Sequence, residues 1–162
     1  MRLVGIDPGL KGALAFFDLE ANTLTCYSMP TVTEQRSKGM KSFLDEGALS
    51  KIVRDHRPTI SIIEDVFSSE QMGVVSAFSF GEGKGILKGV LAAHDCERHY
   101  VSPSVWKGDL ACTADKNQTK RVAKLLLPKC LKILTNEGKC EAALIGLWGC
   151  LQLGLSAAGL TA

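Results

Sequence analysis

The stretch that decides the fold is Val4-Gly5-Ile6-Asp7-Pro8-Gly9, followed by a second apolar run, Gly12-Ala13-Leu14-Ala15-Phe16-Phe17. The first run predicts a buried strand that ends at Asp7, and Pro8-Gly9 predicts a turn that sends the chain back as a second strand. A carboxylate at the end of a buried strand of an α/β sheet lies where such sheets place ligands. Asp7 therefore has two interpretations, an ordinary turn residue or a ligand for a metal or a phosphate. Other carboxylates in the same setting would decide between them.

Length and charge bound the class of protein. The 162 residues are enough for a sizeable core, so we expect one domain over residues 1–162. The net charge of +2 is uninformative, but residues 98–139 hold 9 Lys and Arg against 3 Asp and Glu, whereas residues 1–97 hold 10 against 13. This basic segment suits a polyanionic partner, although a solvated helix face with spare lysines would give the same count.

The cysteine and hydrophobic patterns favour a cytoplasmic protein. The six cysteines form no CxxC pair and no cluster with zinc spacing, so we expect reduced thiols. The apolar strand expected from residue 2 is not preceded by a signal-peptide pattern, so we expect no signal peptide. Residues 142–162 carry no charge and are long enough to span a membrane, but glycine, serine and glutamine interrupt the run. We expect a helix buried against the sheet here, and no membrane contact.

The remaining chain predicts alternating strands and helices. Strands over 2–7, 12–19 and 24–29 form an antiparallel meander, and the polar residues 30–42 predict a loop. The later elements, in order, are a helix over 43–56, a strand over 59–63, a helix over 71–93, a strand over 98–101, a short helical turn from Pro103, a helix from Thr113 or Asp115 to Pro128, and a last helix from Gly138 or Lys139.

The helix expected over 71–93 carries a stripe of small residues. Gly81, Gly85 and Gly89 recur every four residues, although each glycine inside a helix costs about 1 kcal/mol relative to alanine. The stripe indicates that another backbone packs closely against this helix. A sheet, a second helix or a dimer partner would each fit.

Glu64 repeats the arrangement of Asp7. It follows the β-branched run 59–63, so two neighbouring strands that each end in a carboxylate would bring two negative charges together. A divalent cation between them would remove the repulsion, and oxygen ligands suit Mg²⁺ or Mn²⁺. Two unrelated acids at strand ends are the alternative.

The C-terminal half adds a basic helix and a third acid. The helix that follows Asp115 is crowded on one side by Lys116, Lys120, Arg121 and Lys124. Such a surface suits phosphate. Glu141 lies in the first turn of the last helix, where the helix dipole alone would favour an acid. Glu137 lies four residues earlier and shares its face if the helix begins early.

This order of motifs resembles the ribonuclease H-like nucleases, and among them the RuvC-type Holliday junction resolvases, most closely the phage and prophage branch. The matching motifs are Gly5-Ile6-Asp7-Pro8-Gly9, Ile63-Glu64-Asp65-Val66-Phe67, and segments 80–85, 101–107, 114–118 and 141–145, in an order that extends over residues 2–150. The resemblance implies an α/β, ribonuclease H-like fold with a central mixed five-stranded sheet flanked by helices. It also implies a metal-dependent endonuclease that binds four-way (Holliday) and other branched DNA, makes paired symmetric nicks, and works in a bacterial or phage-infected cell.

The resemblance implies a catalytic metal site. Asp7, Glu64 and Glu141 match carboxylates that bind two divalent ions per active site, Mg²⁺ or Mn²⁺. The fourth ligand departs from the family's pattern. Bacterial members place it where this chain has Gly138, and phage-like members tend to have an Asp-His pair at the positions of Asn136 and Glu137. Glu137 could bind instead, the Asn136 amide oxygen could bind more weakly, or Asn136 could only cap the helix.

The resemblance also implies how DNA is held. Phe67 matches an aromatic wedge at the strand-exchange point. Lys107 and Lys116 match basic residues near the scissile phosphate, and we expect Lys116 to be a catalytic residue. The further basic residues expected to contact DNA are Lys84, Lys120 and Arg121. The helix over 71–93 matches a symmetric dimer interface, so we expect a homodimer.

Two alternatives stay open. An impaired metal site would leave a junction-binding protein of the same fold that cuts poorly. An ATP-binding protein of the related actin-like superfamily is disfavoured by the short chain and the single copy of the acid-glycine turn.

Overall fold

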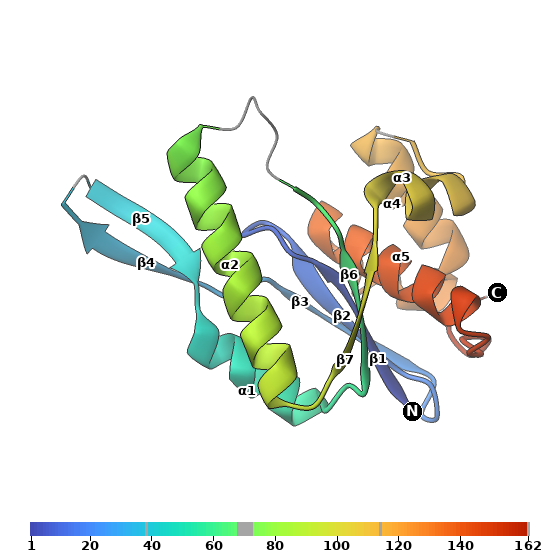
Figure 1. The fold of residues 1–162 in the computed structure, drawn as a ribbon. Coiled ribbons are helices and arrows are strands. Elements are labelled where there is room, and N and C mark those ends of the chain that lie inside the picture. The colour runs from blue at the N-terminus through green and yellow to red at the C-terminus, as the bar shows by residue number, and fades with distance from the viewer. Residues whose placement is uncertain (38, 68–72, 114, 162) are drawn as a thin grey trace.

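The computed structural model describes residues 1–37, 39–67, 73–113 and 115–161, without the side chain of Lys116. Its central sheet has the order β3-β2-β1-β6-β7, in which β1 is antiparallel to β2 and parallel to β6 (Figure 1). The strands are β1 (Arg2–Asp7), β2 (Ala13–Asp18), β3 (Thr23–Ser28), β6 (Ile60–Glu64) and β7 (Glu97–Val101). The mixed five-stranded sheet expected from the sequence is confirmed.

Helices cover both faces of this sheet (Figure 1). The helices of the described residues are α1 (Glu46–His56), α2 (Val74–Ala93), α3 (Pro103–Asp109), α4 (Lys116–Leu126) and α5 (Glu137–Gln152), with a 3-10 turn η1 (Pro128–Cys130). Successive residues of a strand point to opposite faces, so each strand contributes to two cores. Val4 and Ile6 pack with α1 and α2, whereas Leu3 packs with α3, α4 and α5.

The closest packing in the fold joins α5 to the sheet. A Cβ placed on Gly5 of β1 would overlap the backbone of Ala142 and Gly146, and a Cβ on Gly146 would overlap the ring of Phe17. Backbone therefore meets backbone where α5 crosses β1, which requires glycine at both positions. The expectation of a helix buried against the sheet is confirmed. No helix among the described residues is long and apolar enough to cross a membrane.

The prediction of a loop over residues 30–42 is wrong. These residues form a hairpin of β4 (Thr31–Arg36) and β5 (Gly39–Leu44), separate from the central sheet. The hairpin lacks apolar alternation because β4 is exposed along its whole length. Polar contacts stabilise it instead, including a hydrogen bond of 3.1 Å between the hydroxyls of Thr33 and Ser42. Gly39, at φ +113°, supplies a turn conformation that other residues rarely adopt.

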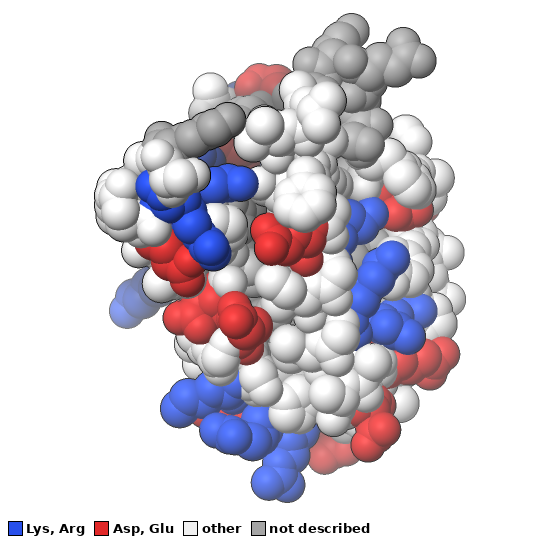
Figure 2. Space-filling view, turned by 60° about the vertical axis from the view of Figure 1, so that its left-hand side comes forward, with Lys and Arg blue, Asp and Glu red and all other residues white. Residues whose placement is uncertain are grey.

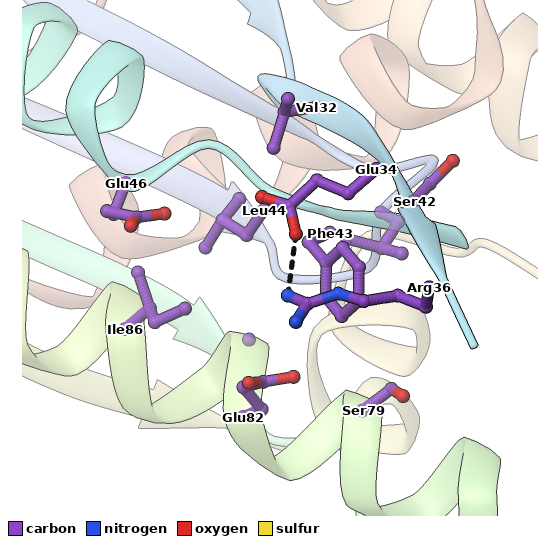
Figure 3. A pocket seen from close by; sticks show the side chains of 12 residues that line it. Val32, Glu34, Arg36, Ser42, Phe43, Leu44, Glu46, Ser79, Glu82 and Ile86 are labelled. Carbon is purple, nitrogen blue, oxygen red and sulfur yellow. Dashed lines mark ion pairs between the residues drawn. The ribbon is translucent and has the colours of Figure 1, made fainter. Parts of the chain in front are cut away.

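The hairpin is attached to the molecule through α2. The Lys41 ammonium lies 2.6 Å from the Ser79 hydroxyl of α2. Figure 3 shows a pocket between the hairpin and α2, where Glu34 and Arg36 form an ion pair of 2.6 Å and the guanidinium lies 4.7 Å from the centre of the Phe43 ring. An isolated two-stranded hairpin is marginally stable in water, so packing against α2 is what holds it in place.

Side-chain caps explain where the helices begin. Residues 43 and 44 belong to β5 rather than to a helix over 43–56, because Asp45 caps α1 by accepting the amide hydrogen of Ala48 at 2.8 Å. Asp115 caps α4 by accepting the amide of Asn117 at 2.9 Å. Asn136 caps α5, so this helix begins at Glu137, slightly before the expected start. The expected start of the helix over 71–93 lies outside the described residues, and α2 is observed from Val74.

We predict that Gly5→Ala destabilises the chain by more than about 2 kcal/mol, because its methyl group has no space between β1 and α5. Gly83→Ala is the matched control, because a Cβ there meets no atom within 4 Å. Alanine is the better helix former, so this control should leave the free energy of unfolding unchanged or raise it by up to about 1 kcal/mol. Urea denaturation measures both, and equal values for the two variants would contradict the close packing of α5 on β1.

Candidate active site

The parallel pairing of β1 and β6 brings the first two acids together. Ile6 is opposite Ile63 in the register, so Asp7 and Glu64 end neighbouring strands at the same level. Alternation along each strand puts both on the face that α5 covers, the face of Gly5 and Ile62. Glu64 is buried, and Asp7 is partly buried with its Oδ1 3.3 Å from the amide of Gly9.

Helix α5 adds two more acids to this end of the sheet. Because Ala142 lies over Gly5, the preceding residue, Glu141, reaches the end of β1, and Glu137 lies about one turn earlier on the same helix face. A cavity of about 200 Å³ is lined by Asp7, Gly9, Lys11, Gly12, Glu137, Gly138 and Glu141. Three carboxylates from distant parts of the chain therefore line one cavity, with Glu64 on the neighbouring strand.

The structure explains why the chain departs from the bacterial pattern at Gly138. A Cβ at this position would lie 2.7 Å from the carbonyl oxygen of Lys11 and 3.0 Å from the Cα of Gly12. The β1–β2 turn thus occupies the space that an acidic side chain at 138 would need. Glu137, one residue earlier, lines the cavity.

Asn136 acts as the cap of α5. Its Oδ1 accepts the amide hydrogen of Lys139 at 2.9 Å, and its Nδ2 lies 3.3 Å from the Ser28 hydroxyl. It is absent from the lining of the carboxylate cavity. Of the two candidates for a fourth ligand, Glu137 is therefore the better placed.

Burial and neighbouring charge raise the pKa of Asp7 and of Glu64. Burial raises the pKa of Asp7 to about 7; the Gly9 amide opposes the rise, and the charges of Glu141, Glu64 and Glu137 add to it. Burial also raises the pKa of Glu64, opposed by a hydrogen bond from Trp106 and reinforced by Glu141. Burial and neighbouring negative charge thus disfavour the ionised forms of Asp7 and Glu64, and perturbed pKa values of this kind are typical of functional sites.

Two consecutive residues of α3 hold two of the acids. Trp106 is completely buried, and its Nε1 donates to Oε1 of Glu64 at 2.9 Å. The Lys107 ammonium forms an ion pair of 3.1 Å with Oε1 of Glu141. Lys107 thus lies beside the acids, and its expected place near the scissile phosphate stays a prediction. The contact of Trp106 was missed by sequence reasoning, and its one sequence signal is that it precedes Lys107.

The other predicted DNA-binding residues whose side chains are described lie on α2, on α4 and just after β6. Phe67 follows β6 and is 76% exposed, and Lys84 lies on α2 beneath it. On α4, Arg121 is exposed and Lys120 is partly buried near Cys140 of α5. No ion pair links either of these two described residues to the acids of the site. The side chain of Lys116 lies outside the described part of the chain, so its role stays a prediction.

The donor set fits a hard divalent cation. Carboxylate oxygens are the ligands that Mg²⁺ and Mn²⁺ prefer, and a cation in the cavity would offset both the burial and the neighbouring negative charges that raise the pKa of Asp7. Among the described residues, however, no three His, Cys, Asp or Glu side chains are close enough together to surround one ion. In the free protein, Trp106 and Lys107 hold two of these carboxylates, Glu64 by a hydrogen bond and Glu141 by an ion pair.

The chain is similar to known nucleases. The crossover junction endodeoxyribonuclease RuvC of Afipia carboxidovorans is 30% identical to it over 135 residues, which cover 80% of this chain and 77% of the relative. The RuvC of Nitrobacter hamburgensis is 27% identical over 139 residues, which cover 80% of this chain and 78% of the relative. No family model matches.

Solved structures show the same fold. The T. thermophilus RuvC in complex with Holliday junction substrate matches with a TM-score of 0.58 and 15% identity, covering 95% of this chain and 97% of that one. The fowlpox virus Holliday junction resolvase matches with a TM-score of 0.54 and 13% identity, covering 94% and 99%.

We predict that Asp7→Asn stabilises the chain at alkaline pH. The Asp7 carboxyl has a pKa of about 7 in the folded chain and about 4 in the unfolded chain. Because the folded chain binds this proton more tightly, the free energy of unfolding falls as the pH rises from about 4 to about 7. At pH 8 without divalent ions, the variant should unfold with a free energy about 1–3 kcal/mol above that of the wild type, and at pH 4 the two should agree. Urea denaturation at both pH values measures the difference, and a difference independent of pH would contradict the raised pKa.

We predict that Trp106→Phe costs about 1–3 kcal/mol, because it leaves the buried Oε1 of Glu64 without its donor. Trp148→Phe is the control, because Trp148 Nε1 donates at 2.8 Å to Asp109, an exposed acceptor that water can satisfy. The control should cost less than about 1 kcal/mol. Thermal denaturation followed by circular dichroism measures the stability of both variants. An equal loss of stability in the two would mean that the hydrogen bond from Trp106 to Glu64 contributes no more than an exposed one.

Proposed function

Because this chain belongs to the RuvC family of crossover junction endodeoxyribonucleases, we propose that it is a Holliday junction resolvase. It binds four-way and other branched DNA and makes paired symmetric nicks by metal-dependent hydrolysis of phosphodiester bonds. The observation that supports this proposal most is the convergence of Asp7, Glu64, Glu137 and Glu141 at one end of the sheet. We place this activity in a single domain over residues 1–162 and in the cytoplasm of a bacterial or phage-infected cell.

The metal ligands in this proposal are four acids. Asp7, Glu64 and Glu141 would hold two Mg²⁺ or Mn²⁺ ions, and Glu137 would be the fourth ligand because it lines the cavity where Asn136 does not. Two such ions would activate the attacking water and stabilise the leaving 3′ oxygen. Glu141 lines the cavity and is paired with Lys107 in the free protein, so a bound cation would compete with Lys107 for this carboxylate.

The reaction is hydrolysis of one phosphodiester in each of two strands. Water attacks the phosphorus, the bond to the 3′ oxygen breaks, and the products are a 5′ phosphate and a 3′ hydroxyl. Lys107, once released from Glu141, and Lys116 offset the negative charge that develops on the phosphate. Trp106 keeps Glu64 oriented during these changes through its indole hydrogen bond.

The surface around the site binds the junction. We assign phosphate contacts to Lys120 and Arg121 on α4, and we assign to Phe67 the role of a wedge between bases at the exchange point. The Phe67 ring is exposed, and an exposed aromatic ring can stack on any base. Such stacking contributes about 1–3 kcal/mol per base to the free energy of binding.

The dimer in this proposal forms through α2. The first turns of this helix expose Val74, Val75 and Phe78, at 86%, 71% and 72% of their surfaces. Among the described residues, no atom lies within 4 Å of a Cβ placed on any of its glycines 81, 85 or 89, so no described residue packs on the stripe. Figure 2 turns the left-hand side of Figure 1 forward and shows uncharged surface that is interrupted by separate acidic and basic clusters, with an acidic one near the middle of the view. A two-fold dimer through such a face would direct two sites at two arms of a junction.

We predict that the wild-type chain nicks a synthetic four-way junction symmetrically in Mg²⁺ or Mn²⁺ and not in EDTA, and that Asp7→Asn binds the junction without cutting it. Losing one carboxylate removes a ligand shared by the metal site but leaves the DNA-binding surface unchanged. Denaturing gels with each strand labelled measure cleavage, and gel shifts measure binding. Lys51→Ala is the control, because Lys51 pairs with Asp55 on α1, on the opposite face of the sheet from the acids.

The outcomes separate the two candidate functions. Cleavage by Asp7→Asn would contradict the metal-site assignment. Tight binding without cleavage by the wild type, in either metal, would favour a junction-binding protein with an impaired site, a reading that the capping role of Asn136 and the glycine at 138 motivate. In that case Asn136→Asp tests whether an added carboxylate restores cutting.

A further inference from the structure

Lys84 is a lysine whose side chain is largely enclosed by protein. Its side chain is only 14% exposed, and it extends from α2 to the turn that follows β6. The ammonium lies 3.3 Å from Oδ1 of Asp65 and donates to the carbonyl oxygen of Val66 at 2.7 Å. An ammonium has three donors, so two of them are used within the protein.

The same ammonium also contacts aromatic rings. It lies 4.9 Å from the centre of the Phe67 ring and 5.8 Å from that of Phe80. A cation at this distance from a ring face is attracted to it. The Phe67 ring is otherwise mostly in solvent, so Lys84 is the described contact that fixes where this exposed ring stands.

The turn between Glu64 and Phe67 is thereby held from two sides. On one side the amide of Asp65 donates to the carbonyl of Val101 at the end of β7, at 2.7 Å. On the other side Lys84 holds the Asp65 carboxylate and the Val66 carbonyl. The catalytic acid Glu64 and the wedge Phe67 flank this turn, so its conformation sets their relative placement.

We propose that Lys84 is a positioning residue that attaches the 65–67 turn to α2 and presents the Phe67 ring to the junction, rather than a contact to DNA phosphate. The functional part of this proposal rests on the proposed resolvase activity. The attachment itself is a property of the protein alone. Lys88, one turn further along α2, is the natural comparison, because it is exposed and its ammonium lies 5.5 Å from the Tyr100 ring.

The first experiment examines the free protein. Hydrogen exchange of the peptide that contains residues 64–67 is compared among wild type, Lys84→Met, Lys84→Arg and the control Lys88→Met. Methionine keeps the length and apolar stem of lysine but removes the charge. We expect at least about 10-fold faster exchange in Lys84→Met, because lost contacts favour local opening. Exchange should be near wild type in Lys88→Met and at least partly restored in Lys84→Arg. Unchanged exchange in Lys84→Met would overturn the attachment, whether or not the protein cuts junctions.

The second experiment examines the junction. A four-way junction with 2-aminopurine at the exchange point reports base unstacking by its fluorescence, and cleavage of the same junction is measured alongside. We expect Lys84→Met and Phe67→Ala each to reduce the fluorescence change and to slow cleavage by about 10-fold. The double variant should be no worse than either single variant, because both changes remove the same placement of the ring.

A direct phosphate contact would give a different pattern. The effect of Lys84→Met would then multiply with that of Phe67→Ala, the fluorescence change would persist, and the slope of log binding constant against log salt would fall by about one. That pattern would overturn the positioning role. A wild-type protein that neither binds nor cuts junctions would instead contradict the proposed function, while the exchange experiment would still decide the attachment.

Discussion

The contact between α5 and β1 at Gly5 determines where the acids of α5 lie relative to those of the sheet. Two backbones meet there with no side chain between them, so a side chain at Gly5 would push α5 away from the sheet. Glu141 precedes the contact residue Ala142, and Glu137 lies one turn further out. The glycine at 138 extends the same close packing to the β1–β2 turn that follows Asp7. A nuclease that must place carboxylates accurately thus relies on positions that have no side chain at all.

The fold also compensates part of the free-energy cost of burying carboxylates close together. Burial first, and the charges of neighbouring acids second, raise the pKa of Asp7, so its ionised form is costly in the free protein. Helix α3 compensates at two other acids with neighbouring residues, an indole N–H for Glu64 and an ammonium for Glu141.

Much of this arrangement is visible in the sequence, for identifiable reasons. Buried strands that end in an acid, such as 2–7 and 60–64, are strong local signals, and the pairing of β1 with β6 follows from the resemblance and from the apolar runs. The hairpin over 31–44 was missed because its strands are polar and are stabilised by α2 rather than by the central core. The contact of Trp106 with Glu64 was missed because it joins residues 42 positions apart, which no local pattern encodes. The choice of Glu137 over Asn136 needed the cavity itself, since both lie at the start of one helix.

The order in which these parts occur along the chain has a consequence for synthesis on the ribosome. Asp7 and Glu64 lie in the first half of the polypeptide, whereas Glu137 and Glu141 belong to the last helix. Chains emerge from the N-terminus, and contacts between distant segments form only when both segments are available. Strands β1, β2 and β3 can form their meander early, but the face that receives α5 remains uncovered until translation has passed residue 152. The carboxylate cluster therefore assembles only at the end of synthesis, so a polypeptide whose translation stops early never acquires the geometry needed to cut DNA.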